Sequence, residues 1–224
     1  HSKCLEIKTI IYVMKIITIV VTRSKSCHVK ALHTILRLNI QCLERHVQNE
    51  ITFCNDDPYE KADIILSCMK KCDRLLFIDF GIGMDVDSIN QVFNNMDGIG
   101  CLVFPGVLDG IDWGLFKSKV LDGSTEPTSQ MGLNFDTEVG KKVSGDIYTV
   151  ENTIAKVFVL NCKLSIKKLT DKNGLKILPK FEKMYAKFKE KGLKIYAYTA
   201  SKLIHTYNHE CISNILNAAG VRAN

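Results

Sequence analysis

The sequence lacks the signals of membrane-spanning and disulfide-linked proteins. Its most apolar stretch, residues 7–22, contains Lys8 and Lys15, so no run reaches the roughly 18–20 apolar residues that a spanning helix requires. The nine cysteines are odd in number, include no CxxC pair and in several cases lie in apolar runs. They predict reduced, mostly buried thiols rather than disulfides or a zinc site. We therefore expect a protein of the cytoplasm with no membrane span.

Two common nucleotide-binding motifs are also missing. The chain contains neither a GxGxxG fingerprint nor a GxxxxGK loop followed by Ser or Thr. Its net charge of +6 and pI of about 8.8 are a mild positive surplus. That surplus is well below the dense basic stripes of proteins that bind duplex nucleic acid, which we do not expect as a partner. It fits an anionic ligand such as a nucleotide or a phosphorylated substrate.

The first half of the chain alternates between strand-like and helix-like patterns. Its strands are continuous apolar runs, which are typical of a mostly parallel sheet covered by helices on both faces. An α/β fold follows from this alternation. The expected strands are 15–22, 50–55, 74–80 and 99–105, and the expected helices are 24–46, 59–72 and 85–96.

The pattern changes after residue 105. Residues 106–146 are rich in Gly, Ser, Asp and Thr, with one short helix expected near 112–120. A stretch this long with little regular structure is usually functional or disordered. We expect an N-terminal extension at 1–13 and one domain at 14–224, divided into a nucleotide-binding half (14–105) and a loop-rich half (106–224). The second half should contain a strand or short helix within 147–166, a helix at 178–192, a strand at 193–199 and a closing helix at 208–220.

Polar residues gather where the predicted parallel strands end. Ligands of such sheets bind at the carboxyl ends of the strands. Arg23 could meet a phosphate or a base, Asp56 a base or ribose, and Asp79 a Mn²⁺ or Mg²⁺ ion, since both ions prefer oxygen ligands. The strand ends are Thr22 and Arg23, then Asn55, Asp56 and Asp57, then Asp79 and Gly81, and finally Pro105 and Gly106.

The acidic residues near these strand ends have different expected roles. Asp57 precedes Pro58 and is expected to cap a helix. Asp85 and Asp87 spell DxD, but their position next to a predicted helix start favours capping and the helix dipole. Gly81 stands two residues after Asp79, where an aspartyl-phosphatase would carry its second acid.

These segments resemble the GT-A class of nucleotide-sugar glycosyltransferases, and in particular those of large DNA viruses. "VVTRS" (20–24) is similar to a first nucleotide-contacting turn, "CNDDP" (54–58) to an acidic base- or ribose-contacting loop, and "LLFIDFG" (75–81) to a metal-binding strand. The resemblance covers roughly residues 14–210. It implies transfer of a hexose or deoxyhexose from a nucleotide-diphospho-sugar, with UDP favoured, to a glycan or protein-linked acceptor.

The resemblance also implies site residues. Thr22, Arg23, Asp56 and Asp79 would bind the nucleotide. Asp79 would hold Mn²⁺ or Mg²⁺, and because Gly81 replaces the second acid of the family's DxD motif, His205 is the candidate to complete the metal's shell. A viral protein would act in the host cytoplasm.

The loop-rich half supplies the remaining candidates. An inverting enzyme needs a carboxylate to deprotonate the acceptor hydroxyl. Asp136 is the candidate base and Asp112 a second catalytic carboxylate, which could also bind sugar hydroxyls together with Asp109. Trp113 could stack on a sugar face. Two alternatives stay open: a nucleotidyltransferase or phosphatase on a similar sheet, and a non-catalytic module that binds nucleotide-sugars.

Overall fold

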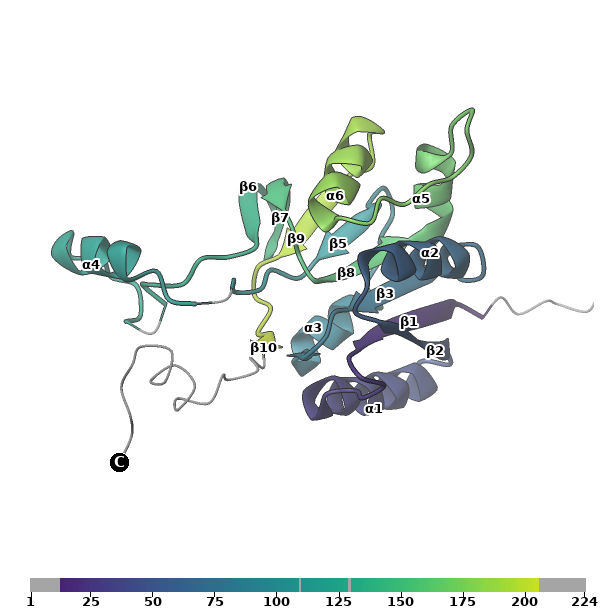
Figure 1. Cartoon of the computed structure of the whole chain (residues 1–224), viewed down its shortest axis with the longest axis horizontal. Coiled ribbons are helices and arrows are strands. Elements are labelled where there is room, and N and C mark those ends of the chain that lie inside the picture. The colour runs from purple at the N-terminus through teal and green to yellow at the C-terminus, as the bar shows by residue number, and fades with distance from the viewer. Residues whose placement is uncertain (1–12, 109, 129, 206–224) are drawn as a thin grey trace, which may run out of the picture.

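An eight-stranded sheet forms the centre of the protein (Figure 1). The computed structural model describes residues 13–108, 110–128 and 130–205. A separate two-stranded sheet joins β4 (Ile82–Gly83) to β10 (Ile204–His205). The strand order of the large sheet is β2 (Gln48–Asn55), β1 (Lys15–Thr22), β3 (Arg74–Ile78), β8 (Val157–Asn161), β5 (Cys101–Val103), β9 (Ile195–Tyr198), β7 (Ile147–Thr153) and β6 (Thr137–Ser144).

The sheet is mostly parallel in direction, as the sequence predicts. Of the eight strands, only β8 and β7 run against the other six. β8 lies between β3 and β5, so these two strands, which follow one another along the chain within the large sheet, are not neighbours in it. The carboxyl ends of β1, β2 and β3 therefore meet directly, while that of β5 is one strand removed.

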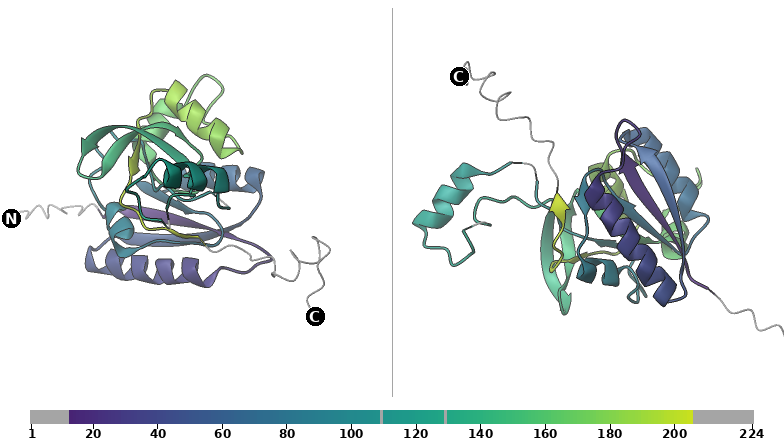
Figure 2. Two further views of the ribbon diagram at one scale, coloured as in Figure 1. Left: turned by 90° about the vertical axis from the view of Figure 1, so that its left-hand side faces the viewer. Right: turned by 90° about the horizontal axis from the view of Figure 1, so that it is seen from below.

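Helices cover both faces of the sheet (Figures 1 and 2). α1 (Val29–Glu44) and α3 (Val86–Gln91) lie on one face. α2 (Pro58–Met69), α5 (Cys162–Leu169) and α6 (Phe181–Glu190) lie on the other. α4 (Trp113–Leu121) stands away from the sheet and buries none of its residues. No helix in the described ranges is long and apolar enough to cross a membrane.

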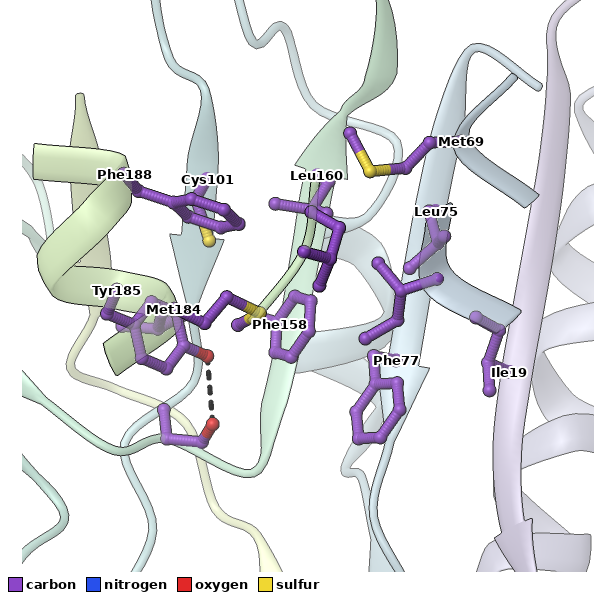
Figure 3. Packing of buried hydrophobic residues seen from close by; sticks show 14 of the residues in the cluster. Ile19, Met69, Leu75, Phe77, Cys101, Phe158, Leu160, Met184, Tyr185 and Phe188 are labelled. Atoms are coloured by element: carbon purple, nitrogen blue, oxygen red, sulfur yellow. Dashed lines mark hydrogen bonds between the residues drawn. The ribbon is translucent and has the colours of Figure 1, made fainter. Parts of the chain in front are cut away.

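The core depends on the alternation of side chains along buried strands. In β1, Ile17 and Ile19 precede and follow Thr18, and both are completely buried on the same face, within the layer beneath α2 and α6. Phe77 of β3 stacks on Phe158 of β8 with ring centroids 5.1 Å apart (Figure 3). The same layer buries the Tyr185 ring, whose hydroxyl donates to the carbonyl of residue 155 at 2.8 Å.

The predicted elements of the first half are confirmed, but several are shorter than predicted: α3 ends at Gln91 and β5 spans only three residues. The strand predicted at 15–22 is β1, whereas the helix predicted at 24–46 begins later, at Val29. Asp57 caps α2, and α3 begins directly after Asp85. The region 147–166 resolves into β7, β8 and the start of α5. The predicted N-terminal extension, apart from Val13, and the predicted closing helix lie outside the described residues. All seven described cysteines are free thiols, as the sequence predicts.

Candidate functional site

Three parallel strands bring the predicted nucleotide-binding residues together. In the β1–β2 register Thr22 lies opposite Asn55, and in the β1–β3 register Val20 lies opposite Ile78. The backbone N–H of Asp56 donates to the carbonyl of Thr22 at 3.0 Å, which fixes the turn after β2 against the end of β1. Residues more than 30 positions apart in the sequence therefore lie at neighbouring strand ends.

The charged side chains at this edge form one continuous chain of ion pairs. Arg23 Nε donates to Asp56 Oδ2 at 2.6 Å, and Lys61 Nζ donates to Asp56 Oδ1 at 2.5 Å. Lys61 Nζ also donates to Asp79 Oδ1 at 2.8 Å. The Arg23 guanidinium lies 4.6 Å from the centre of the Phe80 ring, a cation–π contact that orients it over the loop after β3.

Burial and charge act against each other in this chain. Burial disfavours the Asp56 carboxylate, but hydrogen bonds from Lys61 and Arg23 outweigh it and hold the pKa of Asp56 below its ordinary value. Burial likewise disfavours the Lys61 ammonium, yet Asp79 and Asp56 raise the pKa of Lys61 above its ordinary value. Both groups are therefore ionised at neutral pH. Two cations and two carboxylates balance to zero net charge.

Lys61 is the residue of this site that sequence reasoning missed. It lies in the first turn of α2, and its side chain is only 10% exposed. A lysine in an amphipathic helix is normally solvated, so no local pattern marks it as buried. One signal in the sequence could have found it. Because α2 begins directly after the end of β2 and Asp56, the first turn of α2 lies at the same edge of the sheet.

Gly81 has a backbone reason to be glycine. Its φ is +75°, in the left-handed region that side-chain-bearing residues rarely adopt. An aspartate there, as in a complete DxD motif, would add strain. The chain therefore turns after Asp79 in a way that disfavours the missing second acid.

The described side chains do not fit a divalent metal ion. No group of three His, Cys, Asp or Glu residues converges as metal ligands within the described ranges, and Oδ1 of Asp79 already carries the Lys61 ammonium. Backbone pairing sets His205 opposite Ile82, three residues beyond Asp79, but the His205 side chain lies outside the described part of the structure. The metal pair of Asp79 and His205 remains a prediction.

A cavity of about 350 Å³ opens beside the ion-pair chain. It is within the usual range for small-molecule pockets. Phe53 is more than half exposed at its wall, and it supplies an aromatic surface. The lining residues are Thr22, Lys25, Cys27, Phe53, Cys54, Asn55 and Glu60. A larger cavity of about 520 Å³ lies at the opposite edge of the sheet, near the start of β1, and neither cavity is lined by Asp56 or Asp79.

Asp136, the candidate base, is buried where the loop after β5 meets β6. It accepts from the Gly106 N–H at 3.0 Å and from the Thr137 hydroxyl at 2.8 Å. Burial raises the pKa of Asp136, while these hydrogen bonds partly oppose the rise. Its residue surface is only 5% exposed, so in this conformation the carboxylate crosslinks two loops.

The other candidates of the second half lie on the α4 segment. Asp112 caps α4 by accepting from the Leu115 N–H at 2.8 Å. This hydrogen bond and a second from Asn134 lower the pKa of Asp112. Trp113 is 69% exposed and meets Phe116 edge-on. The α4 segment projects away from the strand-end edge (Figure 1), and Asp109 lies outside the described residues.

No protein-family model and no sequence of a curated protein matches the chain. Solved structures do resemble it. GalNAc-T7 with UDP, GalNAc and Mn²⁺ superposes with a TM-score of 0.50 at 10% identity, over 88% of this chain and 45% of that one. This chain thus spans less than half the length of that protein. A mutant Drosophila β-1,4-galactosyltransferase 7 with manganese, UDP-Gal and xylobiose gives 0.48 at 11% identity, over 88% of this chain and 72% of that one.

The fold is GT-A-like. This confirms the predicted fold class: a mixed α/β sheet with helices on both faces, like that of the GalNAc-T7 structure. At about one identical residue in ten, the likeness concerns the fold and not the individual site residues. The predicted similarity to viral enzymes stays a prediction.

Proposed function

We propose that the chain is a glycosyltransferase that binds a nucleotide-diphospho-sugar, with UDP-sugars favoured, at the carboxyl ends of β1, β2 and β3. The observation that carries this proposal is the chain of ion pairs from Arg23 through Asp56 and Lys61 to Asp79 at that edge of a GT-A-like sheet. A neutralised set of charges, buried at Lys61 and Asp79 and exposed at Arg23, is more than the fold alone requires. Its location is where ligands of such sheets bind.

Each residue of the edge has a proposed role. The nucleoside enters the cavity, where Phe53 offers an aromatic face and the polar groups of Thr22 and Asn55 offer hydrogen bonds. Asp79 accepts from a ribose or sugar hydroxyl through Oδ2, because Lys61 holds Oδ1. Arg23, whose side chain is 52% exposed, meets the diphosphate.

In the transfer step, the acceptor hydroxyl oxygen forms a bond to the anomeric carbon of the donor sugar. The bond from that carbon to the diphosphate oxygen breaks, and the nucleoside diphosphate leaves with the electron pair. Arg23 offsets the charge that develops on it. The proton of the hydroxyl passes to a general base, for which Asp136 and Asp112 remain the proposed candidates. The acceptor is a glycan or a protein-linked sugar, and the transferred group a hexose or deoxyhexose.

Mn²⁺ or Mg²⁺ remains a proposed cofactor by analogy with the two similar structures, whose complexes hold manganese. When bound, such an ion would neutralise diphosphate charge. No step above depends on it, because the described side chains do not assemble a ligand set for it.

A non-catalytic nucleotide-sugar-binding module is the second candidate. The burial of Asp136 favours it, since an enclosed carboxylate is not presented to an acceptor hydroxyl. The two candidates share the same binding edge. They differ in whether donor turnover follows binding.

The test is thermal denaturation with UDP, GDP and CDP, each with and without Mn²⁺, followed by nucleotide release from a panel of sugar donors. We expect UDP to raise the melting temperature and one donor to be turned over. Binding without release would support the module, and no response to any nucleotide would overturn both candidates.

A matched pair of variants localises the site. Asp79→Asn should abolish the nucleotide-induced shift, because Asp79 ends β3 at the proposed site. Asp87→Asn should retain it, because Asp87 lies in the first turn of α3. Equal responses of the two variants would place the ligand elsewhere.

A further inference from the structure

α1 exposes a row of large aliphatic side chains. Its opposite side already packs on the sheet through Ala31, Ile35, Leu38 and Cys42. The fold therefore requires only one apolar side of this helix, and a second, solvent-facing apolar row is a typical sign of an interaction surface. The row consists of Val29, Leu32, Leu36, Ile40 and Leu43, which are between 46% and 76% exposed.

The row follows the period of a helix–helix seam. Its members are separated by three, four, four and three residues, so they lie along one narrow side of α1. A narrow seam of this kind packs against a single facing helix, whereas helices that lie on a bilayer present a broader apolar face. No described element covers the row, and α1 lies on the outside of the molecule (Figure 1).

The seam is symmetric about Leu36. Leu32 and Ile40 lie four residues to either side, and Val29 and Leu43 lie seven residues to either side. A two-fold interface uses the same surface on both copies. If residue i of one copy meets residue j of the other, then residue j of the first copy meets residue i of the second. If two copies of α1 pack antiparallel with the axis at Leu36, then Leu36 meets its own copy, Leu32 meets Ile40 and Val29 meets Leu43.

The charges beside the seam complement this arrangement. Lys30 directly follows Val29 and Glu44 directly follows Leu43, and both are exposed along the same flank of the helix. When Val29 meets Leu43 of the second copy, Lys30 falls beside Glu44 of that copy, and the reverse pair forms at the other end. Arg37 lies nearer the axis and meets its own copy, a like-charge contact that salt screens.

From the symmetric seam and its complementary ends, we propose that α1 is the interface of a homodimer in which two copies of the chain pack their α1 helices antiparallel across a two-fold axis at Leu36. The row points away from the sheet, so the strand-end edge stays accessible in each copy. This inference does not depend on the proposed glycosyl transfer.

Sedimentation velocity over a range of protein concentrations tests the proposal. We expect the wild-type chain to form a reversible dimer and Leu36→Glu, which places two carboxylates at the axis, to be monomeric at every concentration. Leu36 is exposed, so the variant should keep the fold of the monomer, and its melting temperature should match that of the wild-type chain at concentrations too low for dimerisation. Leu121→Glu, at a similarly exposed aliphatic position on α4, is the matched control and should still dimerise.

A charge exchange tests the antiparallel register. Lys30→Glu should weaken the dimer roughly tenfold, because two surface ion pairs become repulsive. The double variant K30E with E44K should restore the wild-type dimer. A wild-type chain that stays monomeric, or a Leu36→Glu chain that still dimerises, would overturn the proposal. A monomer that instead binds vesicles containing phosphatidylserine through α1 would assign the seam to a membrane and overturn it as well.

Nucleotide binding separates this result from the proposed function. Leu36→Glu should show the same nucleotide-induced thermal shift as the wild-type chain. A chain that dimerises but binds no nucleotide would support the proposed interface and contradict the proposed glycosyltransferase function.

Discussion

The strand-end edge and the α4 segment differ in how much buried structure holds them in place. Asp79 directly follows Leu75, Leu76, Phe77 and Ile78, all completely buried. α4 has no buried residue, and its segment is held by the Asp112 cap and by a few bonds to residues 132–135, such as the pairing of Val107 with Phe135. Side chains at the end of a buried strand are fixed relative to one another by the core, whereas the α4 segment is held mainly by the exposed loop at residues 132–135. This contrast explains why the predicted nucleotide residues assemble at one edge, while Asp112 and Trp113 stand on a segment outside the core.

The largest expected effect comes from comparing a substitution in the buried strands with one on the α4 segment. Phe77→Ala removes a fully buried ring that stacks on Phe158, and it should lower the free energy of unfolding by about 3–5 kcal/mol. Trp113→Ala should change it by less than about 0.5 kcal/mol, because the indole is mostly exposed. Urea denaturation measures both. Similar losses from the two variants would mean that α4 packs on the rest of the protein in solution.

The next effect concerns the buried cation. Lys61→Met should destabilise the protein by about 3 kcal/mol, because it leaves Asp56 and Asp79 without their shared ammonium group. Lys70→Met, at the exposed C-terminal end of the same helix, is the control and should be close to neutral. A neutral Lys61→Met would show that the ion pairs at this edge contribute nothing to stability.

A smaller effect is the response of the edge to acid. The pKa of Asp56 is lowered in the folded state, so its contribution to stability is complete above its ordinary value of 3.8 and is lost as the pH falls through the lower folded value. Urea midpoints between pH 7 and about pH 3 should therefore fall more steeply for the wild-type chain than for Asp56→Asn. The difference should be on the order of 1 kcal/mol, the usual contribution of hydrogen bonds at a charged group. Parallel curves would remove Asp56 from the network.

The smallest effect tests the turn after Asp79. Gly81→Ala should cost about 1 kcal/mol, because φ at this position is +75°. Gly81→Asn should cost less, since asparagine tolerates the left-handed region better than alanine. Thermal denaturation of the two variants provides the comparison. An alanine variant as stable as the asparagine variant would show that the turn relaxes.

Local patterns in the sequence predicted the first half of the fold well. The continuous apolar run at 15–22 is β1, and the residues following β1, β2 and β3 are those that meet at the edge. Asp57 as a helix cap also followed from local sequence, because a cap contacts backbone only two and three residues away. The insertion of β8 between β3 and β5 had no local signal, since its partners are distant in the chain.

The sequence by itself determined which segments become buried strands, where they end, and therefore that Arg23, Asp56 and Asp79 gather at one edge of the sheet. Periodicity and capping are properties of neighbouring residues, so the chain alone specifies them. Only the tertiary structure decided that Lys61 joins Asp56 to Asp79 and that Asp136 is enclosed between two loops. It also decided that the apolar row of α1 faces outward. Burial is set by what packs from elsewhere in the chain, and a lysine or a leucine on a helix carries no local mark of it.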